Sequence, residues 1–199
     1  MISTLSKKHS FDGVFDSQKV FRLILEAMSH PARVVSINEY ADKLFGEAPV
    51  FLSVAMTLLD NEVSFNACDN QVLADEIISL TLAKQDEVND SDFIFVNDLN
   101  YKEYAIANAK SGTLSDPHKS AMVVIQDDFE SSCRMTLSGP GIDGQITVQT
   151  TQTVKDAVSL RDAQNYEYPQ GIDLIFISSI GELLAIPRLV MQMGDINED

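Results

Sequence analysis

The sequence is poor in the residues that build disulfide frameworks and metal sites. Its two cysteines, Cys68 and Cys133, are far apart, and each lies in an apolar, strand-like context, so no framework of disulfide bonds is implied. Its histidines, His9, His30 and His118, lie outside metal-ligand spacing of one another and of a cysteine, so we expect no metal site. The chain also lacks a Cys-x-x-Cys pair, the Gly-x-Ser-x-Gly elbow of serine hydrolases and a Walker phosphate-binding loop.

Basic residues are scarce too. The chain has 14 Lys and Arg against 30 Asp and Glu, which gives a formal net charge of -16. This imbalance argues against nucleic acid and against an anionic membrane surface, because both are bound through clustered Lys and Arg. The negative net charge then has two interpretations. It serves solubility or adapts the protein to a saline cell interior, or it attracts a basic partner protein.

Long apolar runs are missing as well. The longest, residues 50–59 and 172–177, are too short to cross a bilayer, and the first ten residues lack the apolar run of a signal peptide. We therefore expect a soluble, reduced, cytoplasmic protein. Its 199 residues show no internal repeat or long linker and suffice for one domain with its own core.

Hydrophobic periodicity predicts helices and strands that alternate early in the chain, followed by a part dominated by strands. One three-layer α/β/α domain with a mixed sheet fits this order best. The expected helices are 16–30, 49–59, 72–84, 101–110 and 154–163, and the expected strands are 34–37, 63–67, 93–96, 122–126, 134–138, 145–150, 172–177 and 183–186. The last two strands should form a hairpin around Gly181, which is apolar enough to be a buried central element or an interface.

The first helix has clear boundaries. Asp16 is a good N-cap residue, and Pro31 should end the helix because its ring disfavours helical backbone at His30. Its apolar residues cover more than half of the helical wheel, so we expect the helix to be mostly buried. They are Val20, Phe21, Leu23, Ile24, Leu25, Ala27 and Met28.

The polar strip of this helix carries a local basic patch, formed by Lys19, Arg22, His30 and Arg33. One interpretation is an ordinary surface pair between Arg22 and Glu26, which are one turn apart. The other is a defined contact with an anion or an acidic partner, because the patch opposes the net charge.

Three further segments could be taken for functional sites. The stretch 139–144 matches Gly-x-Gly-x-x-Gly, but strand-forming residues follow it, so we expect a strand-to-strand turn rather than a dinucleotide loop. Pro117 fixes the backbone before His118, which either bonds a backbone carbonyl or contacts a ligand at the start of a strand. Arg188 follows the last strand and is either an edge-strand guard or a ligand for carboxylate or phosphate.

Taken together, these segments resemble the PhnH subunit family of the bacterial carbon–phosphorus lyase system. The matching residues, which follow one another over nearly the whole chain, are Phe15-Asp16-Ser17-Gln18, Phe21-Arg22, Ala27-Met28-Ser29, Pro31, Leu58-Leu59-Asp60, Gly112-Thr113-Leu114, Pro117-His118-x-Ser120-Ala121, Leu137-x-Gly139-Pro140-Gly141-Ile142, Pro169-x-Gly171-Ile172-Asp173-Leu174-Ile175-Phe176 and Ile186-Pro187-Arg188. One departure is Ala32, where the family usually has glycine. Alanine adopts a positive φ less easily, so the turn is expected to differ slightly.

The resemblance implies a single PhnH-like domain over residues 1–199, with residues 1–14 as a loosely ordered arm. It implies a fold similar to the large domain of pyridoxal-phosphate-dependent transferases but without that cofactor, and we expect no cofactor. It also implies a homodimer that assembles with the PhnG, PhnI and PhnJ subunits. That assembly joins methylphosphonate to the ribose triphosphate of ATP and releases adenine.

These implications favour an accessory subunit that is inactive as an isolated chain, in agreement with the absence of a nucleophile–base pair from the sequence. Two alternatives stay open. One is an active transferase or hydrolase that uses His118 with Arg22 and Arg188 around a phosphate, phosphonate or nucleotide, and the other is a stand-alone small-molecule-binding protein. The candidate ligand- or partner-binding residues are Arg22, Ser29, His30, Arg33, Pro117, His118 and Arg188.

Overall fold

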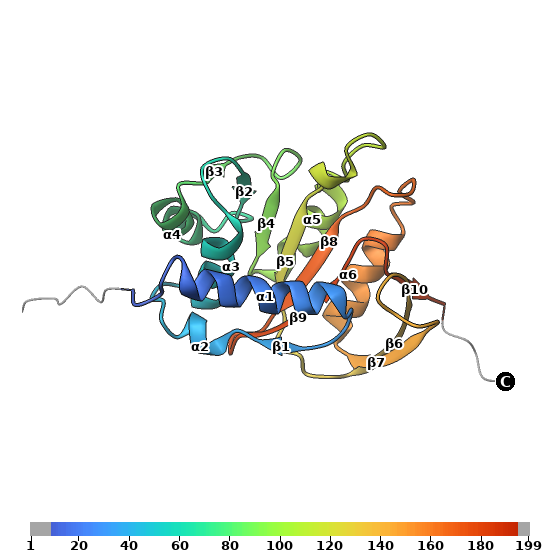
Figure 1. Ribbon diagram of the computed structural model, residues 1–199. Coiled ribbons are helices and arrows are strands. Elements are labelled where there is room, and N and C mark those ends of the chain that lie inside the picture. The colour runs from blue at the N-terminus through green and yellow to red at the C-terminus, as the bar shows by residue number, and fades with distance from the viewer. Residues whose placement is uncertain (1–8, 195–199) are drawn as a thin grey trace, which may run out of the picture.

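A seven-stranded mixed sheet forms the centre of the protein (Figure 1). The computed structural model describes residues 9–194. The strand order is β1-β9-β8-β5-β4-β2-β3, in which the five strands from β8 to β3 run parallel and β9 and β1 pair antiparallel. The strands are β1 (Val35–Ser36), β2 (Ser64–Asn66), β3 (Lys84–Gln85), β4 (Phe93–Val96), β5 (Met122–Gln126), β8 (Asp173–Ile177) and β9 (Glu182–Ile186).

Helices cover both faces of this sheet. On one face lie α1 (Phe15–Ser29), α2 (Asn38–Ala41), α3 (Pro49–Leu58) and α4 (Gln71–Thr81), and on the other lie α5 (Lys102–Asn108) and α6 (Gln152–Asp162). Successive residues of the inner strands therefore enter different cores. Phe95 packs in the core under α1 and α3, whereas Ile94 and Val96 pack in the core under α5 and α6. Burial on both faces explains the continuous apolar runs of the parallel strands, and it confirms the expected α/β class with a mixed sheet.

A second, three-stranded antiparallel sheet lies beside α6. Its order is β10-β6-β7, with β6 (Cys133–Ser138), β7 (Ile146–Thr150) and β10 (Met191–Met193). The expectation of one sheet was therefore incomplete, and β10, with only three residues, was not predicted as a strand. The glycine-rich stretch 139–144 joins β6 to β7, so the prediction of a strand-to-strand turn is confirmed.

The expected hairpin of β8 and β9 is confirmed, with Leu174 opposite Ile186 and Ile177 opposite Leu183. All five residues of β8 are buried, and β9 lies between β1 and β8. The hairpin is thus a central element of the sheet. Since β9 is an inner strand, the interpretation of Arg188 as an edge-strand guard is wrong.

The predicted N-cap of the first helix is also wrong. The amide groups of Val14 and Phe15 donate to Asp12 Oδ1 at 2.8 and 2.9 Å, so Asp12 caps the helix. Asp16 lies inside the first turn, where it accepts from the Asp12 amide at 2.8 Å and pairs with Lys43 at 2.7 Å. The predicted end is confirmed, because α1 stops at Ser29, two residues before Pro31.

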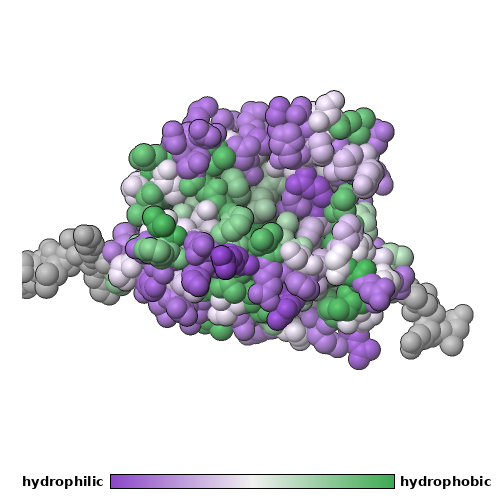
Figure 2. Space-filling view, in the orientation of Figure 1, coloured by the Kyte–Doolittle hydropathy of each residue, from purple (hydrophilic) through white to green (hydrophobic). Residues whose placement is uncertain are grey.

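Helix α1 is less buried than its apolar arc predicts. Val20, Ile24 and Ala27 are buried, but Phe21 is 48% and Leu25 53% exposed. The helix packs against α3, β9 and β1 along one side, and Phe21 and Leu25 on its other side stay exposed. Hydrophobic and strongly hydrophilic side chains therefore lie next to one another along α1 on the front of the molecule (Figure 2).

The expected arm of residues 1–14 falls partly outside the described residues, which begin at His9. Phe11 is buried in the core beside α1, and the Ser10 amide donates to the Lys43 carbonyl at 2.9 Å. Packed structure thus begins before residue 15. Within residues 9–194, no helix has the length and apolarity needed to cross a membrane.

Candidate functional site

Three of the candidate residues, Ser29, His30 and Arg33, gather at the C-terminal end of α1. The Ser29 hydroxyl donates to the Leu25 carbonyl at 2.7 Å, and His30 Nδ1 lies 3.1 Å from the Glu26 carbonyl oxygen. Arg33 forms an ion pair with Glu26 at 2.9 Å. Glu26 is thus paired with Arg33, and the interpretation of Arg22 and Glu26 as a surface pair is wrong.

The turn 139–146 packs against this end of α1. A Cβ atom at Gly141 would lie 2.8 Å from the Ser29 carbonyl oxygen, and its φ is +87°, so the approach requires glycine. A shallow hollow of about 410 Å³ remains between the turn and the helix end, lined by His30, Arg33 and Asp143 among others. Because Asp143 and the ion-paired Arg33 both line it, the hollow has little net charge to attract an anion.

Ala32 lies at the start of this segment with a φ of 66°. The left-handed conformation is therefore present at Ala32, although alanine adopts it less easily than glycine does. The Ala32 amide donates to the Ala185 carbonyl of β9 at 3.2 Å, and the Arg33 amide donates to the His30 carbonyl at 3.0 Å. These bonds hold the turn against the sheet and offset the cost of a positive φ.

Arg188 and Pro117 form a second group, at the amino ends of β5 and β8. The Arg188 guanidinium makes an ion pair with Asp173 and donates through Nη1 to the Pro117 carbonyl. The Arg188 amide donates to the same Asp173 carboxylate at 2.8 Å. Asp173 is buried, so this group is an internal pair that fixes the segment after β9 against the segment before β5.

His118 does not join this group. It lies in a single 3-10 turn, Pro117–Lys119, with its side chain 73% exposed and Nε2 3.9 Å from an Asp116 oxygen. No backbone carbonyl accepts from its ring among the bonds of the described residues, so the first of the two interpretations of His118, a bond to a carbonyl, is wrong. Neither His118 nor Arg22 lines the cavity beside Arg188. The residues proposed for an active transferase are thus not brought together in that cavity.

Arg22 lies on the exposed side of α1, next to Phe21 and one turn before Leu25. Within residues 9–194, neither Arg22 nor Lys19 forms an ion pair. Arg22 adjoins Leu25 on the helix surface, and Leu25 adjoins Phe21, whereas Lys19 lies beyond Arg22. The structure therefore leaves two unpaired cations on one side of two exposed apolar side chains. We refer to Lys19, Phe21, Arg22 and Leu25 as the α1 face.

One polar crevice was not predicted from the sequence. It has a volume of about 560 Å³ and lies at the carboxyl ends of β4 and β5, where parallel sheets commonly bind ligands. Asp127, Asp128 and Glu130 make it acidic, which is unfavourable for a phosphonate. Hydrogen bonds from the amide and hydroxyl of Ser179 hold the pKa of Asp128 below its ordinary value, so it stays charged at neutral pH. The sequence signal that indicates this crevice is the polar run that follows each of the strands β4 and β5.

The described residues offer no metal centre, and the thiol of Cys68 is not activated. Within residues 9–194, no group of three or more His, Cys, Asp and Glu side chains is arranged to hold a metal ion. Burial raises the pKa of the Cys68 thiol to about 12, so it is protonated and unreactive at neutral pH.

Comparison with known proteins gives a consistent result. The family model of the bacterial phosphonate metabolism protein PhnH matches residues 9–191. The chain is also 26% identical over 172 residues to HtxG of Stutzerimonas stutzeri, a protein named as a C-P lyase subunit, and the match covers 86% of this chain and 83% of HtxG. The chain belongs to the PhnH family of bacterial phosphonate metabolism proteins.

Proposed function

We propose that this protein is a subunit of a carbon–phosphorus lyase assembly, and that it acts by docking rather than by making or breaking bonds itself. The family match and the name of HtxG support the role as a subunit. The exposed α1 face supports the docking role, and it is the observation on which the proposal depends.

Two properties of the α1 face favour a protein contact. Phe21 and Leu25 are each about half exposed, although residues of this kind are usually covered in a folded protein. Lys19 and Arg22 supply positive charge in a chain whose net charge is -16. An apolar pair with cations along one side fits a partner surface whose apolar area has an acidic margin on that side.

The proposed partners are the PhnG, PhnI and PhnJ subunits, and the proposed reaction of the assembly joins methylphosphonate to the ribose triphosphate of ATP with release of adenine. We further propose that the protein is a homodimer, that it works in the cytoplasm, and that its fold is related to the large domain of pyridoxal-phosphate-dependent transferases. Its own candidate contact residues remain Arg22, Ser29, His30 and Arg33.

Co-expression with PhnG, PhnI and PhnJ tests the docking role. A tagged chain should bring down the other subunits, and Arg22→Ala combined with Leu25→Ser should weaken recovery about tenfold or more, as expected when central contact residues are truncated. Val72→Ser is the matched control, since Val72 is 58% exposed on the first turn of α4. The α1 variant must keep its melting temperature within a few degrees. If both variants bind like the parent chain, the α1 face is not the docking surface.

Activity of the isolated chain separates docking from catalysis. The purified chain should release no adenine from ATP in the presence of methylphosphonate, whereas the co-expressed assembly should. Turnover by the isolated chain would favour the alternative, an active transferase that uses His118, Arg22 and Arg188.

A further inference from the structure

Strand β7 is a free sheet edge. It is the last strand of the three-stranded sheet, whose order is β10-β6-β7, and it lies near the lower right margin of the molecule in Figure 1. Ile146, Thr147 and Gln149 are exposed, and Val148 is half-buried. Within residues 9–194, the backbone of residues 146–149 forms no hydrogen bond with any element other than β6. One row of its N–H and C=O groups is therefore open to another strand.

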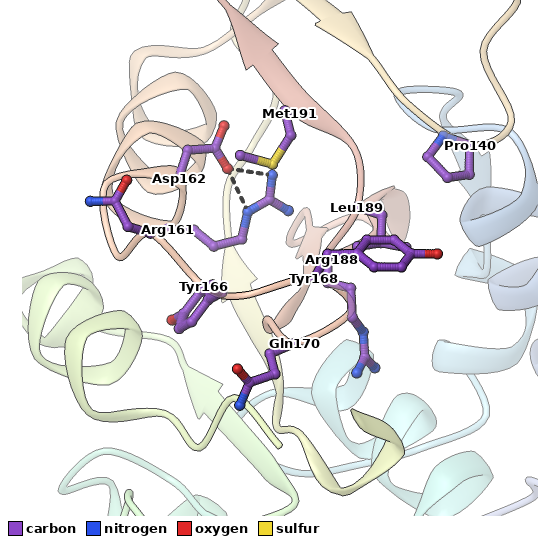
Figure 3. Close-up of a pocket in the computed structure, with 10 residues that line it drawn as sticks. Pro140, Arg161, Asp162, Tyr166, Tyr168, Gln170, Arg188, Leu189 and Met191 are labelled. Carbon is purple, nitrogen blue, oxygen red and sulfur yellow. Dashed lines mark hydrogen bonds and ion pairs between the residues drawn. The ribbon is translucent and has the colours of Figure 1, made fainter. Parts of the chain in front are cut away.

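The other sheet edges are short or occupied. β1 and β3 have two residues each, and the exposed Lys84 lies on β3. β10 has three residues and packs on α6, where the Gln192 amide donates to Asp162 Oδ2 at 2.8 Å. Asp162 and Met191 of β10 both line an apolar cavity of about 430 Å³, in which Asp162 also pairs with Arg161 (Figure 3). Short strands, lysines and covering helices protect sheet edges, whereas β7 has five residues and no charge.

The composition of β7 also differs from that of the rest of the chain. Residues 144–154 contain no charged side chain, although the protein has 30 Asp and Glu and 14 Lys and Arg. Most residues of the strand Ile146–Thr150 are β-branched, which favours strand pairing. An exposed and uncharged edge of this kind is a site at which chains associate.

Charge favours a second copy of this chain as the occupant of the edge. In a two-fold contact the same surface lies on both sides, so charged residues there meet like charges. Copies with a net charge of -16 repel one another, and an uncharged strand is a surface on which they can approach closely. The α1 face is unsuited to this contact, because it would bring Lys19 and Arg22 of the two copies together.

We propose that two copies of this protein pair through β7, in antiparallel orientation and with Val148 on the two-fold axis. This inference rests on the homodimer proposed above and assigns its contact to residues. The two small sheets form one sheet in the order β10-β6-β7-β7-β6-β10. The strands then overlap over their full length, with Thr147 opposite Gln149 and Ile146 opposite Thr150 of the other copy. A shift by one residue would place side chains of the two faces opposite one another.

Two double variants of the full chain test this proposal. Thr147→Glu with Gln149→Glu places like charges directly opposite each other across the axis, whereas Thr147→Lys with Gln149→Glu places opposite charges there. The two variants are matched within the chain. Both lose the bond between Thr147 Oγ1 and Thr136 Oγ1 at 3.0 Å, and both place the same glutamate opposite Arg134 of β6. They should therefore have the same melting temperature within a few degrees.

Size-exclusion chromatography with light scattering, at micromolar concentration, measures the mass of each protein. The parent chain and the variant with opposite charges should have twice the chain mass of 22.0 kDa. The variant with like charges should have the mass of one chain, because repulsion at two symmetric pairs raises the dissociation constant about tenfold or more. Backbone hydrogen exchange in residues 146–150 of the parent chain should become faster on dilution, as the edge is uncovered.

The outcomes separate this inference from the proposed homodimer. If the variant with like charges stays dimeric, or if dilution leaves the exchange of residues 146–150 unchanged in a dimeric parent chain, the placement on β7 is overturned and the homodimer stands. If both variants are monomeric, the register with Val148 on the axis is wrong. A parent chain that is monomeric throughout refutes the homodimer and this inference together. Recovery of the other subunits through the α1 face is a separate measurement.

Discussion

The ion pair between Arg188 and Asp173 should contribute to stability, and Asp173→Asn tests this. The carboxylate of Asp173 is buried and accepts from the Arg188 amide, from Nε and from Nη2. Asparagine keeps the shape and one oxygen acceptor but removes the charge. The Arg188 cation, whose side chain is 21% exposed, then loses its carboxylate partner.

The expected cost follows from this geometry. Removal of one partner from a buried ion pair costs about 3–5 kcal/mol. We expect about 3 kcal/mol here, because Arg188 keeps its bond to the Pro117 carbonyl and retains some contact with solvent. For a chain of this size such a loss lowers the melting temperature by about 6–12 °C.

Urea unfolding of Asp173→Asn, Arg188→Met and the double variant measures the free energy of unfolding. The double variant should lose clearly less than the sum of the two single variants, because it leaves no unpaired buried charge. A loss below about 1 kcal/mol for Asp173→Asn, the range of an exposed pair, would refute the reasoning. So would additive losses in the double variant.

Three further predictions concern stability. Burial raises the pKa of Asp92, but hydrogen bonds from Lys110 and Ser64 outweigh burial and hold this pKa below its ordinary value. The charged Asp92 therefore stabilises the folded state. This contribution is fully present above a pH of about 3.9 and is lost as pH falls through the lower folded-state pKa. Asp92→Asn should therefore cost about 1–2 kcal/mol at neutral pH in urea unfolding, with the difference from the parent chain vanishing in acid. Gly141→Ala should lower the free energy of unfolding by about 3 kcal/mol, because it combines a positive φ with a close contact. Gly144→Ala has a φ of +71° but open space around the new methyl group, so it should lower the free energy of unfolding by about 1 kcal/mol. Equal losses in the two variants would contradict the close packing of the turn. Ala32→Gly should raise the free energy of unfolding by about 0.5 kcal/mol, because relief of the positive φ exceeds the cost of the added entropy of the unfolded chain. A loss of stability would show that the contacts of the alanine methyl group are worth more than this relief.

Local chemistry made part of the fold predictable. Pro49 stands at the start of α3 and the continuous run Phe93–Val96 forms a buried parallel strand, as their sequences predict. The strand-forming residues after Gly144 correctly excluded a dinucleotide loop. In each case the decisive information lies within a few residues of the element.

What the sequence could not provide is the partner of each side chain. A helical wheel shows that α1 has a wide apolar arc, but the number of elements that cover it depends on the tertiary fold, and here Phe21 and Leu25 stay exposed. Glu26 could pair with Arg22 within the helix, yet the turn after the helix brings Arg33 closer. Arg188 likewise meets Asp173, 15 residues away, only because β8 and β9 are adjacent.

The distribution of paired and unpaired cations bears on how an acidic chain could bind an acidic partner. Arg161 and Arg188 are neutralised inside the protein, whereas Lys19 and Arg22 lie on the α1 face without an ion pair within residues 9–194. At physiological ionic strength charges are screened beyond about 8 Å, so the net charge of -16 has little effect at close contact and the nearest cations dominate. Recovery of the partner subunits should therefore fall as salt is raised, and Arg22→Ala should weaken both the complex and its salt dependence. A complex whose recovery is insensitive to salt would show that apolar contact alone, through Phe21 and Leu25, holds the partner.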